Sequence, residues 1–320
     1  MTTIKKIALE EHFMAPGFQE YTAMFFDKIE SADQQDLAAR LDDFDQLRLE
    51  EMDRHGIETV VLSQSGPSVQ AEADTQRAIR RARENNDYLA DRIAPHGDRY
   101  AGFATLAMQD PAAAADELEY AVRELGFKGS LVNGHTNGVY YDDPAYDAFW
   151  ERMQDLDVPL YLHPINPWKE LDSMRGHPEL AGAVWGWGVE TGTHALRLLF
   201  GGVFDRFPNL KIILGHMGEG LPFMRWRFDS RFPVYAQGVT LERAPSEYFG
   251  RNIVITTSGV CSAPTLMAAI GEMGEDGVLF SVDYPYESTE LATRFIDDAP
   301  MSDEVRAKVC RDNAKRLLKL

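Results

Sequence analysis

The residues of this chain that could bind a metal ion recur at one kind of position, the end of a short apolar run. Glu10 and His12 close the first run, and His163, His216 and Asp283 close three later ones. On a strand, Glu10 and His12 would point to the same side, because side chains alternate. Imidazole and carboxylate ligands together suit Zn2+ or Mn2+, and the sequence does not choose between them. The types and spacing therefore predict a divalent metal site.

A single histidine is more often structural than a metal ligand, and the chain has eight of them. The joint placement at the ends of successive runs favours the metal site. A second metal would need a bridging lysine carbamate, but Lys128 precedes the fourth run, which ends at Asn133. We therefore expect one metal ion.

Short runs rich in Val, Ile and Leu alternate with amphipathic segments of helical length, which is typical of parallel strands with helical crossovers. We predict eight strands, at residues 7–11, 58–63, 100–106, 129–133, 159–163, 211–216, 253–258 and 277–283. We predict helices at residues 41–55, 75–93, 112–125, 144–156, 190–204, 222–232, 263–273 and 303–318. Eight strand and helix pairs indicate an α/β fold, a closed (β/α)8 TIM barrel forming one domain over residues 1–320.

Two connections in this pattern are long, residues 13–40 after the first strand and 164–189 after the fifth. Such insertions at the C-terminal ends of barrel strands commonly form the substrate pocket. Phe25 and Phe26 lie in the first insertion, and we predict that they contact the substrate. The alternative is that they pack the loop against the rim of the barrel.

Composition narrows the class of partner. The formal charge of −19 argues against nucleic acid and anionic membrane surfaces. Cys261 and Cys310 form no metal-binding or disulfide pattern, and the chain shows neither a signal peptide nor an apolar run long enough to span a membrane. We expect a cytoplasmic enzyme acting on a small molecule.

Six short strings carry a resemblance to a known family. They are Ala8-Leu9-Glu10-Glu11-His12-Phe13, Leu131-Val132-Asn133-Gly134, Tyr161-Leu162-His163-Pro164, Leu214-Gly215-His216-Met217-Gly218-Glu219, Thr256-Thr257-Ser258-Gly259 and Phe280-Ser281-Val282-Asp283-Tyr284-Pro285. Together they resemble the nonoxidative decarboxylase branch of the amidohydrolase superfamily, and within it the γ-resorcylate (2,6-dihydroxybenzoate) type. The likeness extends over nearly the whole chain, to Asn313-Ala314-Lys315-Arg316-Leu317.

The resemblance implies a role for each matching residue. It makes Glu10, His12, His163 and Asp283 the metal ligands and places His216 with Glu219 beside the metal. It implies that Asn133 and Arg227 contact the substrate, and that the protein is a homodimer or homotetramer. The Glu-x-His opening favours the γ-resorcylate type, because the 2,3-dihydroxybenzoate and salicylate enzymes tend to have Ala in place of His12. Val282-Asp283-Tyr284 departs from the usual Thr-Asp-Trp of that type.

The function that these residues predict is the reversible decarboxylation of an ortho-hydroxybenzoate. Without an organic cofactor the substrate must accept the electrons of the breaking bond, and an ortho oxygen allows this once the ring carbon is protonated. We expect Asp283 to be the carbon acid, with the metal holding the carboxylate and ortho oxygen. The competing interpretation is a metal-dependent hydrolase of a lactone or amide with Asp283 as general base.

Overall fold

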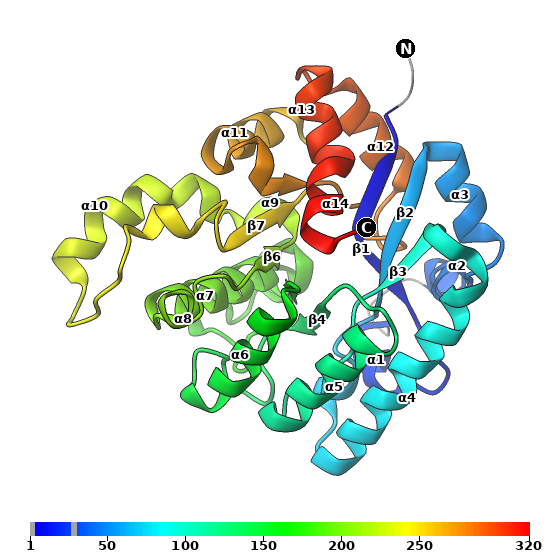
Figure 1. Ribbon diagram of the computed structural model, residues 1–320, viewed down its shortest axis with the longest axis horizontal. Helices are drawn as coiled ribbons and strands as arrows, with labels where there is room; N and C mark the ends of the chain where they lie inside the picture. The colour runs from blue at the N-terminus through cyan, green and yellow to red at the C-terminus, as the bar shows by residue number, and fades with distance from the viewer. Residues whose placement is uncertain (1–3, 27–30) are drawn as a thin grey trace.

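The computed structural model describes residues 4–26 and 31–320, and for residues 23–26 and 31–33 it describes the backbone alone. Eight parallel strands form its centre (Figure 1): β1 Lys6–Phe13, β2 Ile57–Gln64, β3 Tyr100–Gly102, β4 Ser130–Asn133, β5 Leu160–His163, β6 Ile212–Leu214, β7 Ile253–Thr256 and β8 Val278–Leu279. Each lies within or close to a predicted run. The predicted strands at 100–106 and 277–283 are shortened to three and two residues.

The strands form two sheets, β1-β2-β3 and β4-β5-β6-β7-β8, and two isolated bridges close them into a ring. One bridge pairs Ala104, two residues beyond β3, with Ser130, the first residue of β4. The other pairs Glu11 with Tyr284, and the His12 amide donates to the Tyr284 carbonyl over 2.7 Å. The second closure brings the end of β1 beside the segment that follows β8, so it joins two of the predicted metal-binding positions.

The helices form the outer layer (Figure 1): α3 Leu47–His55, α4 Thr75–Ile93, α5 Pro111–Arg123, α6 Asp147–Leu156, α7 Gly186–Phe200, α8 Val203–Arg206, α10 Arg225–Tyr235, α11 Ala263–Met273, α12 Thr289–Asp298 and α13 Asp303–Ala307. Our prediction omitted α12. α5 begins one residue before its predicted start. The Asp110 carboxylate caps it by accepting from the Ala112 and Ala113 amides, and Pro111 lies in its first turn. The chain ends in a π-helical turn, Lys308–Asp312, and α14 Asn313–Leu318.

The two long connections are partly ordered as helices, which the predicted loops did not include. The first contains α1 Gln19–Phe26 and α2 Ser31–Asp42, and the second contains three short 3-10 turns, Asp172–Met174, Pro178–Leu180 and Gly182–Val184. The side chains of Phe25 and Phe26 lie outside the described residues, so their predicted contact with substrate stays a prediction.

Two apolar clusters hold the barrel together. The inner one fills the barrel and includes Ile7, Leu9, Val61 and Phe103, with Leu318 of α14 packed against its N-terminal end. The larger one lies between the strands and the surrounding helices. Because side chains fill the barrel, reactive groups can meet only at its open C-terminal end.

Candidate metal centre and pocket

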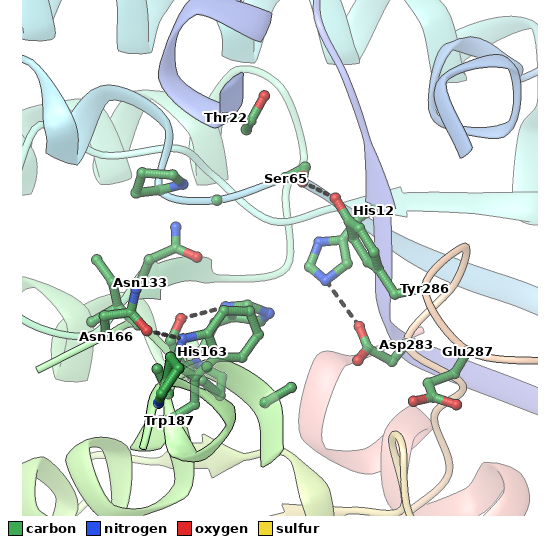
Figure 2. Close-up of a pocket in the computed structure, with 18 residues that line it drawn as sticks. His12, Thr22, Ser65, Asn133, His163, Asn166, Trp187, Asp283, Tyr286 and Glu287 are labelled. Carbon is green, nitrogen blue, oxygen red and sulfur yellow. Dashed lines mark hydrogen bonds and ion pairs between the residues drawn. The ribbon is translucent and has the colours of Figure 1, made fainter. Parts of the chain in front are cut away.

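Glu10, His12, His163 and Asp283 converge at the C-terminal end of the barrel, as predicted from their places at strand ends (Figure 2). One ligand atom from each lies within 4.8 Å of those from the others. His12 Nε2 is 3.3 Å from Asp283 Oδ1, and His163 Nε2 is 3.4 Å from Glu10 Oε1. Two histidines and two carboxylates at these separations can surround one divalent cation.

Among the described residues, three of the four inward-facing atoms, Glu10 Oε1, His12 Nε2 and Asp283 Oδ1, are buried and accept or donate no hydrogen bond of good geometry. Their contacts across the centre are the ion-pair distances of 3.3 and 3.4 Å given above. A buried polar atom left without a partner costs about 1–3 kcal/mol. Three such atoms turned toward one point fit a metal ion that satisfies them all at once.

The hydrogen bonds behind Glu10 fix which of its oxygens faces the centre. The hydroxyls of Tyr161 and Ser258 both donate to Oε2, and Thr256 Oγ1 lies 2.8 Å from the Tyr161 hydroxyl. Oε1 is left for the metal. Burial raises the pKa of Glu10 above its usual value, so the carboxylate depends on these donors and on a nearby cation to stay charged.

Similar contacts orient the two histidines. His12 Nδ1 lies 3.2 Å from the hydroxyl of Ser63, and His163 Nδ1 donates to the Pro164 carbonyl over 2.9 Å. In a neutral ring His163 Nε2 then faces the centre with a free lone pair, and His12 Nε2 can do the same when Nδ1 donates to Ser63. Burial lowers the pKa of His163 to about 3, which keeps the ring neutral as a metal ligand must be.

A β-bulge in β1 aims Glu10 and His12 at the site. Ile7 and Leu9 point into the barrel, so regular alternation along the strand would turn Glu11 inward and Glu10 outward. Glu10 nevertheless faces the site. The pairing with β2 shifts between Ala8 and Glu11, and the consecutive amides of Leu9 and Glu10 both donate to Ser281 Oγ, over 3.1 and 2.6 Å. The extra residue turns the strand end toward the open face of the barrel.

Asp283 lies in an uncommon backbone conformation, with φ of +80°. Its carbonyl accepts from the amides of Tyr286 and Glu287, over 2.9 and 3.0 Å, which holds the turn in place. Strained backbone of this kind clusters at functional sites. Burial would raise the pKa of Asp283, but interactions with His12 and His216 outweigh it and lower the pKa well below the usual range. The group is therefore a carboxylate before substrate arrives.

His216 and Glu219 lie together beside the predicted metal ligands, where the resemblance placed them. The turn from His216 to Glu219 has positive φ throughout, and a Cβ at Gly218 would lie 2.7 Å from Ile255 Cγ2. This turn brings His216 Nδ1 within 2.8 Å of Glu219 Oε1 and directs Nε2 to within 3.5 Å of Asp283 Oδ2. Burial alone would lower the pKa of His216, but Glu10 and Glu219 raise it well above the usual value.

A cavity of about 390 Å³ opens above the metal ligands and is the natural place for a substrate. Figure 2 shows Asn133, Asn166 and Trp187 on one side of it, and Tyr286 and Glu287 on the other. Asn133 thus lies where we expected. Asn166, Trp187, Tyr286 and Glu287 were not among the predicted site residues, although Asn166 and Trp187 belong to the long connection that was expected to form the pocket.

Arg227 is not brought to this cavity by its own chain. It is exposed on α10, which extends outward from the barrel (Figure 1), and lines a separate surface hollow with Phe200, Phe228 and Tyr235. Among the residues that the structure describes, the cavity above the metal ligands has no lysine or arginine in its lining.

Comparison with known proteins agrees with this arrangement. Residues 12–320 match the family model described as amidohydrolase. The γ-resorcylate decarboxylase of Polaromonas sp. is 45% identical over 328 residues, covering 98% of each chain. Among solved structures, 2,6-dihydroxybenzoate decarboxylase complexed with 2,6-dihydroxybenzoate has a TM-score of 0.92 at 44% identity, covering 99% of each chain. The Polaromonas dihydroxybenzoic acid decarboxylase with bound manganese and 2-nitroresorcinol has a TM-score of 0.92 at 45% identity, covering 99% of this chain and 97% of that one. The chain belongs to the amidohydrolase family.

Proposed function

We propose that this protein is a metal-dependent decarboxylase of an ortho-hydroxybenzoate, with 2,6-dihydroxybenzoate or a near relative as substrate. The observation that carries the proposal is the convergence of ligand atoms from Glu10, His12, His163 and Asp283 beside a cavity of about 390 Å³, which has room for an aromatic ring. The relatives that bind manganese and 2,6-dihydroxybenzoate support it, because their similarity extends over the whole chain.

Glu10, His12, His163 and Asp283 would hold Mn2+ or Zn2+. When bound, the ion supplies Lewis acidity toward the carboxylate and the ortho oxygen of the substrate. The rings of Trp187 and Tyr286 leave a slot for the aromatic ring between the two sides of the cavity.

Asp283 moves the proton on which the reaction depends. As a carboxylate at rest it takes the proton of the ortho hydroxyl and then delivers it to the ring carbon that bears the carboxylate. Protonation makes that carbon tetrahedral. The carbon–carbon bond then breaks, its electron pair restores the aromatic ring and leaves the ortho oxygen as phenolate, and carbon dioxide departs. The phenolate finally takes a proton from water.

The remaining polar groups orient the substrate in this proposal. His216, held by Glu219, would donate from Nε2 to a substrate oxygen beside Asp283. Asn133, on the opposite side of the cavity, would contact an oxygen on the ring. Neither group needs to change its charge for the reaction to proceed.

Arg227 can serve as a substrate contact only across an interface between two copies of the chain, because its own chain holds it away from the cavity. Two observations support such an interface. The α10 region carries exposed apolar side chains, among them Trp226 and Val234, and the described residues that line the cavity include no lysine or arginine. We propose a homodimer or homotetramer in which Arg227 of one copy faces the cavity of another.

The other expectations about partners stay proposals. The net charge of −19 supports the absence of a nucleic-acid partner, and the two unpaired cysteines are compatible with the reducing cytoplasm. No helix in the described part of the chain is both long and apolar enough to cross a membrane.

A panel of substrates tests the function. The manganese-loaded protein should release carbon dioxide from 2,6-dihydroxybenzoate or a related ortho-hydroxybenzoate, but not from benzoate or 4-hydroxybenzoate, which cannot offer the ortho oxygen. Hydrolysis of lactones or amides, with no carbon dioxide from any hydroxybenzoate, would replace the proposal with the hydrolase alternative.

A further inference from the structure

Gln70 is a buried polar residue that touches the pocket only through another residue. It lies in a 3-10 turn, Ser68–Ala71, in the connection that follows β2, and only 5% of its surface is exposed. The same connection supplies Ser65, Gly66 and Pro67 to the lining of the cavity, whereas Gln70 does not line it. Its amide points instead toward the end of β4.

The side-chain amide of Gln70 binds both backbone groups of Asn133. The Asn133 amide donates to Gln70 Oε1 over 2.6 Å, and Gln70 Nε2 donates to the Asn133 carbonyl over 3.2 Å. In a parallel sheet, two residues of a neighbouring strand would supply this acceptor and this donor. Buried backbone groups are almost always paired, and here the Gln70 side chain supplies the hydrogen bonds that a neighbouring strand would otherwise supply.

The sheet leaves this position without a strand neighbour on one side. β3 ends at Gly102, and the last backbone bond from that side runs from the Leu131 amide to the Ala104 carbonyl over 3.3 Å. On the other side β4 pairs with β5, where Asn133 is in register with His163. The Gly134 amide also donates to the His163 carbonyl over 2.9 Å.

The Asn133 amide fixes the orientation of the Gln70 side chain. A backbone N–H can only donate, so Oε1 must face it and Nε2 must point the other way. Nε2 then lies 2.9 Å from Thr136 Oγ1 and 2.7 Å from the Tyr141 hydroxyl, and these two oxygens, which lie 2.9 Å apart, can both accept from it. The connection also packs directly on the Asn133 side chain, since a Cβ at Gly66 would lie 2.1 Å from Asn133 Oδ1.

We propose that Gln70 is a positioning residue that takes the place of a missing strand neighbour and holds the end of β4, and with it Asn133 and the adjacent His163, against the cavity. It thereby joins two walls of the pocket, the Ser65–Pro67 segment and the ends of β4 and β5. A misplacement of about 1 Å in a group that positions substrate can cost on the order of a hundredfold in rate.

The kinetic part of this inference rests on the proposed decarboxylase function. Gln70→Met keeps the side-chain volume and removes all of these hydrogen bonds. Gln109→Met is the matched control, because Gln109 Nε2 also binds this connection, at the carbonyls of Val69 and Glu72 over 2.7 and 2.8 Å, without touching β4. A role limited to the stability of the connection would affect both variants alike.

The experiment measures kcat and KM for 2,6-dihydroxybenzoate, and hydrogen exchange at the Asn133 amide, in the manganese-loaded proteins. Gln70→Met should raise KM at least tenfold and speed exchange at Asn133, while Gln109→Met stays within about threefold of the parent. Equal kinetics in the two variants, or unchanged exchange at Asn133, would overturn the proposal.

Two further arms keep the result decisive. If Gln70→Met does not fold, Gln70→Glu retains the acceptor for the Asn133 amide but sets a carboxylate against its carbonyl, and a KM equal to the parent's would again overturn the proposal. If the parent protein releases no carbon dioxide from any hydroxybenzoate, the proposed function fails, and the exchange rate at Asn133 still decides the role of Gln70.

Discussion

Replacing Tyr161 with phenylalanine removes one oxygen atom from behind the metal centre and leaves the shape of a fully buried side chain unchanged. The lost hydroxyl donates to Glu10 Oε2, the oxygen that faces away from the proposed ion. Among the described side chains, Ser258 is then the one donor left to that oxygen. A hydrogen bond to a charged group contributes about 1.5–3 kcal/mol. Because 1.4 kcal/mol corresponds to about tenfold in an equilibrium constant, the loss corresponds to roughly 10- to 100-fold weaker metal binding, the range measured for outer partners of metal ligands.

The dissociation constant for Mn2+ is measured by competition with a chelator of known affinity, at a fixed pH. Tyr248→Phe is the matched control, because the Tyr248 hydroxyl also donates to a carboxylate. That carboxylate belongs to half-buried Asp205 and is not one of the metal ligands. Tyr161→Phe should weaken Mn2+ binding and Tyr248→Phe should not. An Mn2+ affinity within threefold of the parent for Tyr161→Phe would refute the reasoning that the bonds to Oε2 orient Glu10.

Three more outcomes follow from the geometry. Asp283→Asn should lower kcat by at least about a hundredfold while substrate still binds in an equilibrium titration, and near-normal turnover would exclude Asp283 as the carbon acid. Arg227→Ala and Asp283→Asn chains, each impaired alone, should recover activity when unfolded and refolded together, because a mixed oligomer contains an intact cavity facing an intact Arg227; additive residual activity would place Arg227 outside the site. Burial lowers the pKa of His194 to about 3, whereas an unfolded histidine has a pKa of roughly 6.5. The contribution of neutral, buried His194 to stability is therefore present above about pH 6.5 and is lost as the pH falls toward 3. The free energy of unfolding of His194→Gln, measured by urea titration, should therefore fall less steeply with decreasing pH than that of the parent, whereas parallel slopes would contradict the burial argument.

The convergence of Glu10, His12, His163 and Asp283 could be predicted because the ends of parallel barrel strands meet at one face. Position alone did not separate these four from His216, which also ends a predicted strand; only the resemblance to the family made that choice. The number of strands was predictable for another reason: each strand of a parallel barrel is buried on both sides and therefore appears in the sequence as a short apolar run.

Other features depend on geometry that alternation of residue types does not specify. The bulge that turns Glu10 toward the site depends on Ser281, distant in sequence, accepting two consecutive amides. Tyr161 and Ser258 look like ordinary strand residues until their hydroxyls are placed beside Glu10. The position of Arg227 depends on the direction in which α10 leaves the barrel. The spacing of apolar residues predicts a helix there but not its direction.

The most direct test of the central claim is the fate of the ring carbon that loses its carboxylate. The manganese-loaded protein is incubated with 2,6-dihydroxybenzoate in D2O, and the 1,3-dihydroxybenzene and carbon dioxide are quantified by mass spectrometry. Decarboxylation with protonation of the ring carbon predicts equal amounts of the two products, with one deuterium on the carbon that bore the carboxylate. Absence of carbon dioxide under these conditions, while the same protein hydrolyses a lactone or amide, would contradict the account.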